Sequence, residues 1–315
     1  MSGIETIVEY GCLSDEQRWK ADRYAWGWLA DLDEHDRRMV KLLDCLADGE
    51  FSGQASGFQF HDLMLREIAD GYPQHLVHDW GELFAYLHII CYEELRHGLS
   101  IGLAHHYVQH GNFDFVRQLS IREFGRKYVW CYDERRYWNI YSYVLAHLFG
   151  EVVNTELYRD MRAQIHHPNL KQIITNIMSD EARHTRAWAT MIKNLVSLDP
   201  EHMRRAVAAL DVGLTHHNAM VHETYFEGQN KMMGIFLPAQ NGKKGAIDRI
   251  LERKWGLLLE IFGDSNPFTE EQVKEIHLRF LQRARGQTRA VYSPDAEAGI
   301  EFKRPASPQP SNTVR

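Results

Sequence analysis

Several features that mark particular classes of protein are scarce or missing in this sequence. It has four cysteines in 315 residues and no C-x-x-C pair, which excludes a zinc-finger spacing and a dense disulfide framework. It has no apolar run approaching eighteen residues and no apolar segment near its start, so we expect neither a membrane span nor a signal peptide. Its net charge of −7 leaves no basic excess for binding phosphates, so nucleic acid is not an expected partner. These absences favour a cytoplasmic globular protein.

Sustained alternation of apolar and polar residues, the pattern of a half-buried strand, is also missing. Apolar residues instead recur every three or four positions, which predicts amphipathic helices. The segments with this period are 15–47, 58–69, 80–110, 137–165, 169–198, 201–232, 244–262 and 269–286. The sequence therefore predicts an all-α fold with a single helical domain over 1–292. The remainder, 293–315, is rich in Pro, Ser and charge, which predicts an extended or disordered tail.

One charged pattern occurs twice, each time within an apolar helical segment. The stretch "YEELRHG" carries Glu94 and His97, and "SDEARHT" carries Glu181 and His184. Residues three apart lie on the same face of a helix, so each pair can direct a carboxylate and an imidazole at one metal ion. Charges on an apolar helix face must be paired or bound to metal. Two such motifs, together with one carboxylate from each of two further helices, form a dinuclear site in a four-helix bundle.

Two further acids are therefore sought on the other two helices. Glu151 and Glu181 are equally distant along the chain from His166 in the "HHP" turn, so antiparallel helices folded there bring the two acids to the same height. For the remaining helix the choice is less clear. We predict Glu67 in "MLREIADG", with Asp62 as the alternative.

The predicted ligands also indicate the metal. Four carboxylates and two imidazoles, with no thiolate, suit iron or manganese with open coordination positions and suit a closed structural zinc site poorly. We predict two iron ions.

The doubled motif, an acid followed by Glu-x-Arg-His, resembles the ferritin-like diiron-carboxylate superfamily. The resemblance covers roughly 58–200 and is closest in motif to soluble acyl-carrier-protein desaturases, bacterial monooxygenase hydroxylases and para-aminobenzoate N-oxygenases. It implies a ferritin-like four-helix bundle, here flanked by the helices at 15–47 and 201–286. It also implies iron as Fe²⁺/Fe³⁺, O₂ as co-substrate, an electron-donor reductase or ferredoxin, and a homodimer as one expected assembly.

The resemblance assigns roles to further residues. It implies that Glu93, Arg96, Asp180 and Arg183 form an outer shell that orients the opposite histidine. Oxygenases and desaturases often carry a threonine one turn after the third-helix glutamate, which here is Thr155. The alternative for Thr155 is an ordinary helical threonine bonded to the backbone.

Two positions at which the sequence differs from the superfamily pattern narrow the range of expected functions. Ile101 stands where radical-generating reductase subunits have a tyrosine, and Ile177 where the N-oxygenases have a seventh ligand. We therefore expect a monooxygenase that hydroxylates, or N-oxygenates, a small organic or carrier-tethered substrate. A desaturase acting on acyl chains bound to carrier protein is the alternative enzyme, and a non-catalytic metal-binding protein is the alternative of another class.

Overall fold

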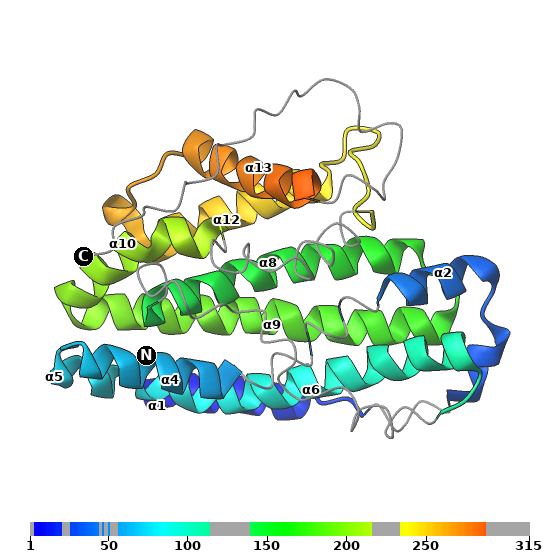
Figure 1. Cartoon of the computed structure of the whole chain (residues 1–315), viewed down its shortest axis with the longest axis horizontal. Helices are drawn as coiled ribbons and strands as arrows, with labels where there is room; N and C mark the ends of the chain where they lie inside the picture. The colour runs from blue at the N-terminus through cyan, green and yellow to red at the C-terminus, as the bar shows by residue number, and fades with distance from the viewer. Residues whose placement is uncertain are drawn as a thin grey trace, which may run out of the picture.

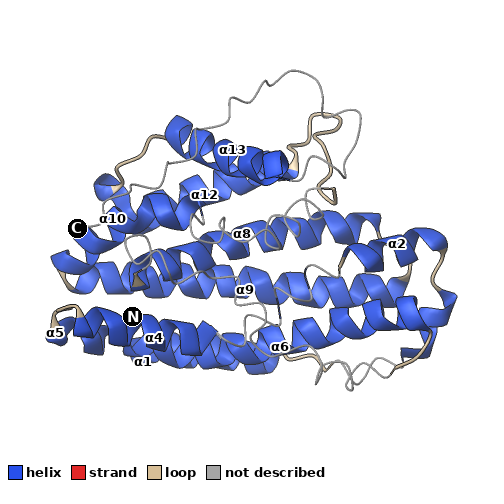
Figure 2. Ribbon diagram, in the orientation of Figure 1, coloured by secondary structure: helices blue, strands red, loops and turns tan. Residues whose placement is uncertain are grey.

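The fold was analysed in a computed structural model, which describes residues 3–20, 26–43, 46, 50, 56–113, 139–215 and 234–287. Across these residues the regular structure is helical, with one isolated β-bridge between Gln240 and Lys243 (Figure 2). The helices in chain order are α1 (Gly3–Glu16), η2 (Trp26–Asp31), α2 (Glu34–Leu42), α4 (Ser56–Ala69), α5 (Gln74–Val77), η3 (His78–Trp80), α6 (Gly81–His110), α8 (Ile140–Gln164), α9 (Pro168–Leu198), α10 (Pro200–Thr215), α12 (Ala246–Phe262), η5 (Gly263–Ser265) and α13 (Glu270–Gln287). The predicted all-α fold is confirmed.

The centre of the protein is a ferritin-like bundle built on three long helices, α6, α8 and α9 (Figure 1). The fourth position is shared by α4, which contacts α6 near its start, and α2, which contacts α6 near its end. Helix α1 lies along the outside against α6 and α9. Helices α10 and α12 cover the other side of α8 and α9, and α13 packs on α10 and α12. The bundle therefore has flanking helices on two sides.

The first predicted helix, 15–47, is wrong as a single element. Helix α1 ends at Glu16, and a new helix, α2, begins after Asp33. The Asp33 carboxylate accepts a hydrogen bond from the backbone N–H of Asp36 at 2.7 Å. Such an N-cap satisfies a backbone donor at a helix start, so it fixes a helix boundary inside an apolar period. The predicted tail, 293–315, lies outside the described residues.

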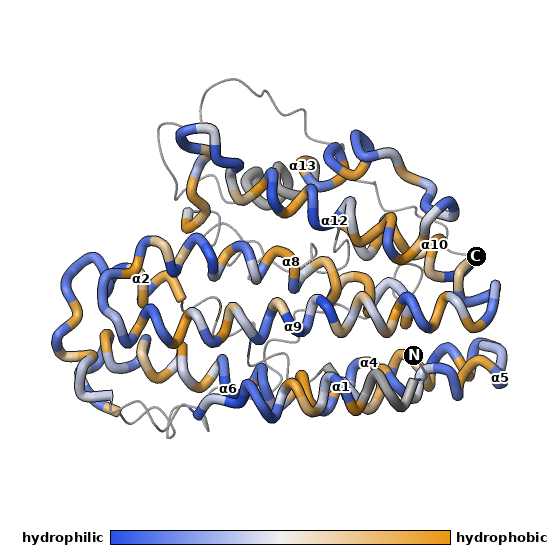
Figure 3. The backbone as a smooth tube through the Cα atoms, turned by 180° about the vertical axis from the view of Figure 1, so that it is seen from behind, coloured by the Kyte–Doolittle hydropathy of each residue, from blue (hydrophilic) through white to orange (hydrophobic). Residues whose placement is uncertain are grey.

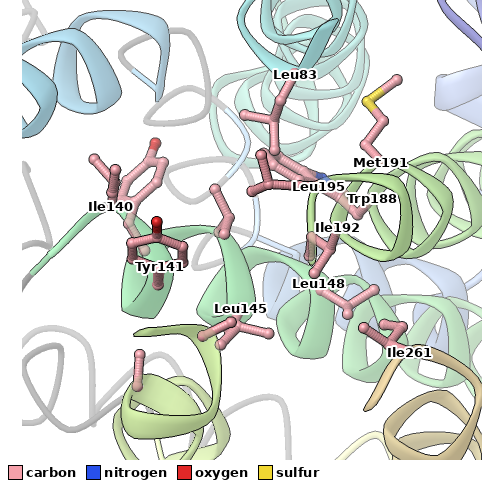
Figure 4. Packing of buried hydrophobic residues seen from close by; sticks show 14 of the residues in the cluster. Leu83, Ile140, Tyr141, Leu145, Leu148, Trp188, Met191, Ile192, Leu195 and Ile261 are labelled. Carbon is pink, nitrogen blue, oxygen red and sulfur yellow. The ribbon is translucent and has the colours of Figure 1, made fainter. Parts of the chain in front are cut away.

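Apolar and polar residues both recur along each helix, as the tube in Figure 3 shows. None of the described helices is long and apolar enough to cross a membrane. The apolar faces pack into two separate cores, one at each end of the bundle. In the first, Leu148 of α8, Ile192 of α9 and Ile261 of α12 lie together (Figure 4).

The gap between the two cores determines where charged side chains can gather. Along α6, the first core takes Leu83 to Ile90 and the second takes Ile101 and Ala104. The same division occurs along α8 and α9, where the apolar contacts change from one core to the other near the middle of each helix. The doubled charged motif falls in this middle layer on both α6 and α9.

Candidate metal centre

Two groups of buried carboxylates and imidazoles lie in the layer between the cores. One consists of Glu50, Glu94, His97 and Glu181, the other of Glu94, Glu151, Glu181 and His184, and in each group the ligand atoms lie within 4.8 Å of one another. Glu94 and Glu181 belong to both groups. Two groups that share two carboxylates have the arrangement of a dinuclear centre with bridging ligands.

The imidazoles mark the two ends of this arrangement. His97 Nδ1 lies 3.2 Å from an oxygen of Glu50 and 3.2 Å from an oxygen of Glu181. His184 Nδ1 lies 3.2 Å from an oxygen of Glu94 and 3.7 Å from the other oxygen of Glu181. Each carboxylate of the shared pair therefore faces both halves of the site.

The donor atoms of the two groups are better suited to binding metal ions than to forming hydrogen bonds with one another. His184 Nδ1, both oxygens of Glu181 and one oxygen of Glu151 are buried and have no hydrogen-bond partner among the described residues. A buried polar atom without a partner costs roughly 1–3 kcal/mol. Four buried carboxylates carry four negative charges, which two divalent cations would balance while both imidazoles stay neutral. The chemistry of this donor set thus accommodates two metal ions.

The pKa shifts of the site residues also indicate that the buried negative charges lack balancing cations. Burial, followed by the charges of neighbouring glutamates, raises the pKa of Glu94 and of Glu151 well above the usual range. Burial alone would lower the pKa of His97 and His184, but the surrounding carboxylates favour the protonated rings and raise it well above the usual range. Without metal the site therefore retains protons on these groups. Metal binding would displace those protons.

The outer hydrogen bonds cross between α6 and α9. His97 Nε2 lies 2.9 Å from Asp180 of α9, and His184 Nε2 lies 2.7 Å from Glu93 of α6. A carboxylate can only accept, so each Nε2 carries a hydrogen. When metal binding displaces the second ring proton, the lone pair of each Nδ1 faces the carboxylate groups. Burial would raise the pKa of Glu93, but the hydrogen bond from His184 and the adjacent cations hold it far below its usual range.

Two arginines add further hydrogen bonds between α6 and α9. Arg96 donates to Asp180 at 2.7 Å, and Arg183 donates both to Asp180 at 3.0 Å and to Glu93. The four residues that the superfamily resemblance places in the outer shell are therefore hydrogen-bonded around the two histidines. Their action on a bound metal stays a prediction.

The segment around the end of α1 supplies partners that the sequence analysis did not consider. Ser14 donates to Glu93 at 2.5 Å, and Trp19 Nε1 donates to Asp180 at 2.8 Å. The Trp19 ring is nearly parallel to the His97 imidazole, with ring centroids 6.1 Å apart and an 8° interplanar angle. These residues precede the predicted bundle by about forty positions, so no local spacing connects them with the motifs.

The structure does not place the predicted first-helix acids in either group. Asp62 is half-exposed and forms an ion pair with Arg66 at 2.8 Å on the surface of α4. An oxygen of Glu67 accepts a hydrogen bond from the backbone N–H of Ile140 at 2.6 Å. Both are therefore corrections, and Glu50 takes the position that they were expected to fill.

A signal for Glu50 was present in the sequence. Glu50 and Glu94 are equally distant from Tyr72, just as Glu151 and Glu181 are from His166. The chain turns at Gly71, whose φ is +93°, so Tyr72 is close to the reversal point. Glycine-rich composition around 48–57 made this stretch look like a break, although Glu50 itself is helical and 4 % exposed.

Two hydroxyl groups on α8 lie near the site. Tyr158 is buried and donates its hydroxyl hydrogen bond to Glu50. Thr155 is also buried, and its hydroxyl donates to the backbone carbonyl of Glu151 at 2.8 Å. The observed Thr155 contact is that of an ordinary helical threonine, and its catalytic role stays a prediction.

Fold and site together define an all-α ferritin-like bundle with a buried pair of carboxylate–histidine groups at its centre. A sequence-family model described as "Fatty acid desaturase" matches residues 160–225, about a fifth of the chain. The matched part includes α9 and its motif with Asp180, Glu181, Arg183 and His184. No curated protein and no solved structure matches the chain. The match supports an oxidoreductase of the desaturase type, a class that typically depends on iron.

Proposed function

We propose that this protein is an O₂-dependent non-haem diiron oxidoreductase, most simply a monooxygenase that hydroxylates or N-oxygenates a small organic or carrier-tethered substrate. The observation that carries the proposal is the pair of buried groups that share Glu94 and Glu181. A structural metal site would satisfy all its positions with protein ligands, whereas four ligands for each ion, two of them shared, leave octahedral positions open. Open positions are what O₂ activation requires.

Each residue in the site has a defined part in the proposal. Glu50 and His97 would hold one iron, Glu151 and His184 the other, and Glu94 and Glu181 would bridge them. The irons would supply the oxidation of substrate by O₂. The chain itself would fix the imidazole tautomers through Asp180 and Glu93 and would keep bulk water out through the two apolar cores.

Two outcomes for the substrate are distinguished by where oxygen goes. Hydroxylation, which the sequence analysis favours, consumes O₂, two electrons and two protons and puts one oxygen atom into the product and one into water. Desaturation consumes the same reactants, removes two hydrogens from adjacent carbons and releases two waters. The family match over residues 160–225 favours desaturation of an acyl chain on a carrier protein as the second candidate. Both outcomes need an external electron donor, for which a reductase or ferredoxin is proposed.

The metal centre is tested before any substrate. Protein from iron-supplemented cells should contain about two irons per chain by plasma mass spectrometry, and Glu94→Ala and His184→Ala should lose iron. Reduced protein exposed to O₂ should change its optical spectrum. One zinc per chain, or no iron, would contradict the proposal and favour a non-catalytic metal-binding role.

The reaction type is then decided with ¹⁸O₂ and a panel of small organic substrates and carrier-tethered acyl chains. One ¹⁸O atom in the product identifies a monooxygenase. A product that has lost two hydrogens and contains no ¹⁸O identifies a desaturase.

A further inference from the structure

A second cluster of metal-binding side chains lies at the end of the bundle where α8 turns into α9. A nitrogen of His35, an oxygen of Asp36 and a nitrogen of His166 lie within 4.8 Å of one another. The cluster joins the start of α2 to the "HHP" turn. His166 and Glu181 are fifteen positions apart on the chain, which places the cluster about 22 Å along α9 from the buried carboxylates.

Each of the two imidazoles has one ring nitrogen hydrogen-bonded to an oxygen that can only accept. His35 Nε2 lies 3.0 Å from the backbone carbonyl of Gln164, and His166 Nδ1 lies 2.9 Å from a carboxylate oxygen of Asp33. Carbonyl and carboxylate oxygens only accept, so these nitrogens carry hydrogens. In the neutral rings the lone pairs are therefore on His35 Nδ1 and His166 Nε2. Metal-binding histidines are typically oriented in this way, by a carbonyl or carboxylate on the other ring nitrogen.

The surrounding contacts hold the Asp36 carboxylate and bring the two imidazole rings together. The Asp36 carboxylate is buried and accepts hydrogen bonds from the backbone N–H groups of His166 at 3.0 Å and His167 at 2.6 Å. The rings of His35 and His166 are stacked, with centroids 4.5 Å apart and an angle of 19°. The neighbouring His167 ring stacks on Trp28, which belongs to the second core. The Asp36 carboxylate is therefore held in place before any ion binds.

We propose that His35, Asp36 and His166 bind a zinc ion between α2 and the α8–α9 turn. Two imidazoles and a carboxylate form a three-ligand zinc set, and the exposed side of His166 leaves the fourth position to water. Donors on one tetrahedral zinc lie roughly 3.3 Å apart, and a bound ion lies in the plane of each imidazole, so the exposed His166 ring must turn out of its stack on His35 when zinc binds. The proposal is independent of the buried centre, because the two sites share no residue.

The test is calorimetric titration of zinc into the full-length, iron-loaded protein. We expect one additional zinc per chain with a micromolar Kd. His35→Ala and His166→Ala should each weaken this binding by tenfold or more. The matched control is His75→Ala, which removes an exposed imidazole from α5 and should leave zinc binding unchanged.

A further variant separates a metal site from a merely structural cluster. Asp33→Asn keeps an N-cap for α2, since asparagine caps as well as aspartate, but weakens the hydrogen bond that orients His166. Zinc should then bind about tenfold more weakly or worse, while the circular dichroism spectrum stays that of the wild type.

The outcomes are distinguishable from those of the diiron proposal. Absence of zinc binding beyond the buried centre, or equal binding in wild type, His35→Ala and His166→Ala, would overturn the inference. If the buried centre fails to take iron, the total zinc bound is compared instead, and the loss of one equivalent in His166→Ala still supports the peripheral site.

Discussion

Replacing Glu50 with glutamine tests which acid completes the buried centre. The substitution keeps the size of the side chain and an oxygen that can accept the hydrogen bond from Tyr158, but it removes one of the four negative charges that balance two divalent ions. Removing one partner from a buried ion pair costs about 3–5 kcal/mol. That loss corresponds to roughly two to three and a half orders of magnitude in affinity. Because Glu50 belongs to only one of the two groups, the loss should fall on one ion alone.

The assay is iron content after dialysis against a graded chelator, with Glu67→Gln as the matched control. Wild type and Glu67→Gln should retain about two irons per chain, since Glu67 lies outside both groups and its contact is a backbone hydrogen bond. Glu50→Gln should retain about one, and so should Glu151→Gln, which affects the other group. Two tightly held irons in Glu50→Gln, or loss of iron in Glu67→Gln, would refute the assignment.

Three further predictions concern other parts of the chain. Burial lowers the pKa of Lys254 to about 7, so folding becomes less favourable as the pH falls from about 10 to 7. The stability advantage of Lys254→Met over wild type in urea unfolding should grow by about 1.4 kcal/mol per pH unit over that range, and a constant difference would contradict this. Glu93→Gln should weaken iron binding about 10- to 100-fold without changing the stoichiometry, because His184 loses its charged partner; wild-type affinity would argue against that role. A Cβ at Gly213 would lie 2.5 Å from a side-chain carbon of α8, so Gly213→Ala should destabilise the protein by about 1–3 kcal/mol, whereas Gly256→Ala, with nothing within 4 Å, should not.

The sequence by itself determined the three long helices and five of the six residues in the two buried groups. Helix period depends on local side-chain order, so the predicted 80–110, 137–165 and 169–198 agree with α6, α8 and α9 to within three residues. The doubled motif places Glu94 beside His97 and Glu181 beside His184 because a helix turn brings i and i+3 together. Glu151 followed from counting along two straight helices joined by a short turn, which is also a local property.

The tertiary structure alone decided the remaining contacts, because they join residues distant in the chain. Glu50 lies in a stretch whose sequence has no helical period, and it reaches the site only when α2 and α4 pack against α6. Ser14 and Trp19 reach Glu93 and Asp180 only because α1 folds back along α6 and α9. The separation of the apolar residues into two cores likewise requires all the helices in place, and that separation gives four carboxylates and two imidazoles a buried polar layer in which to meet.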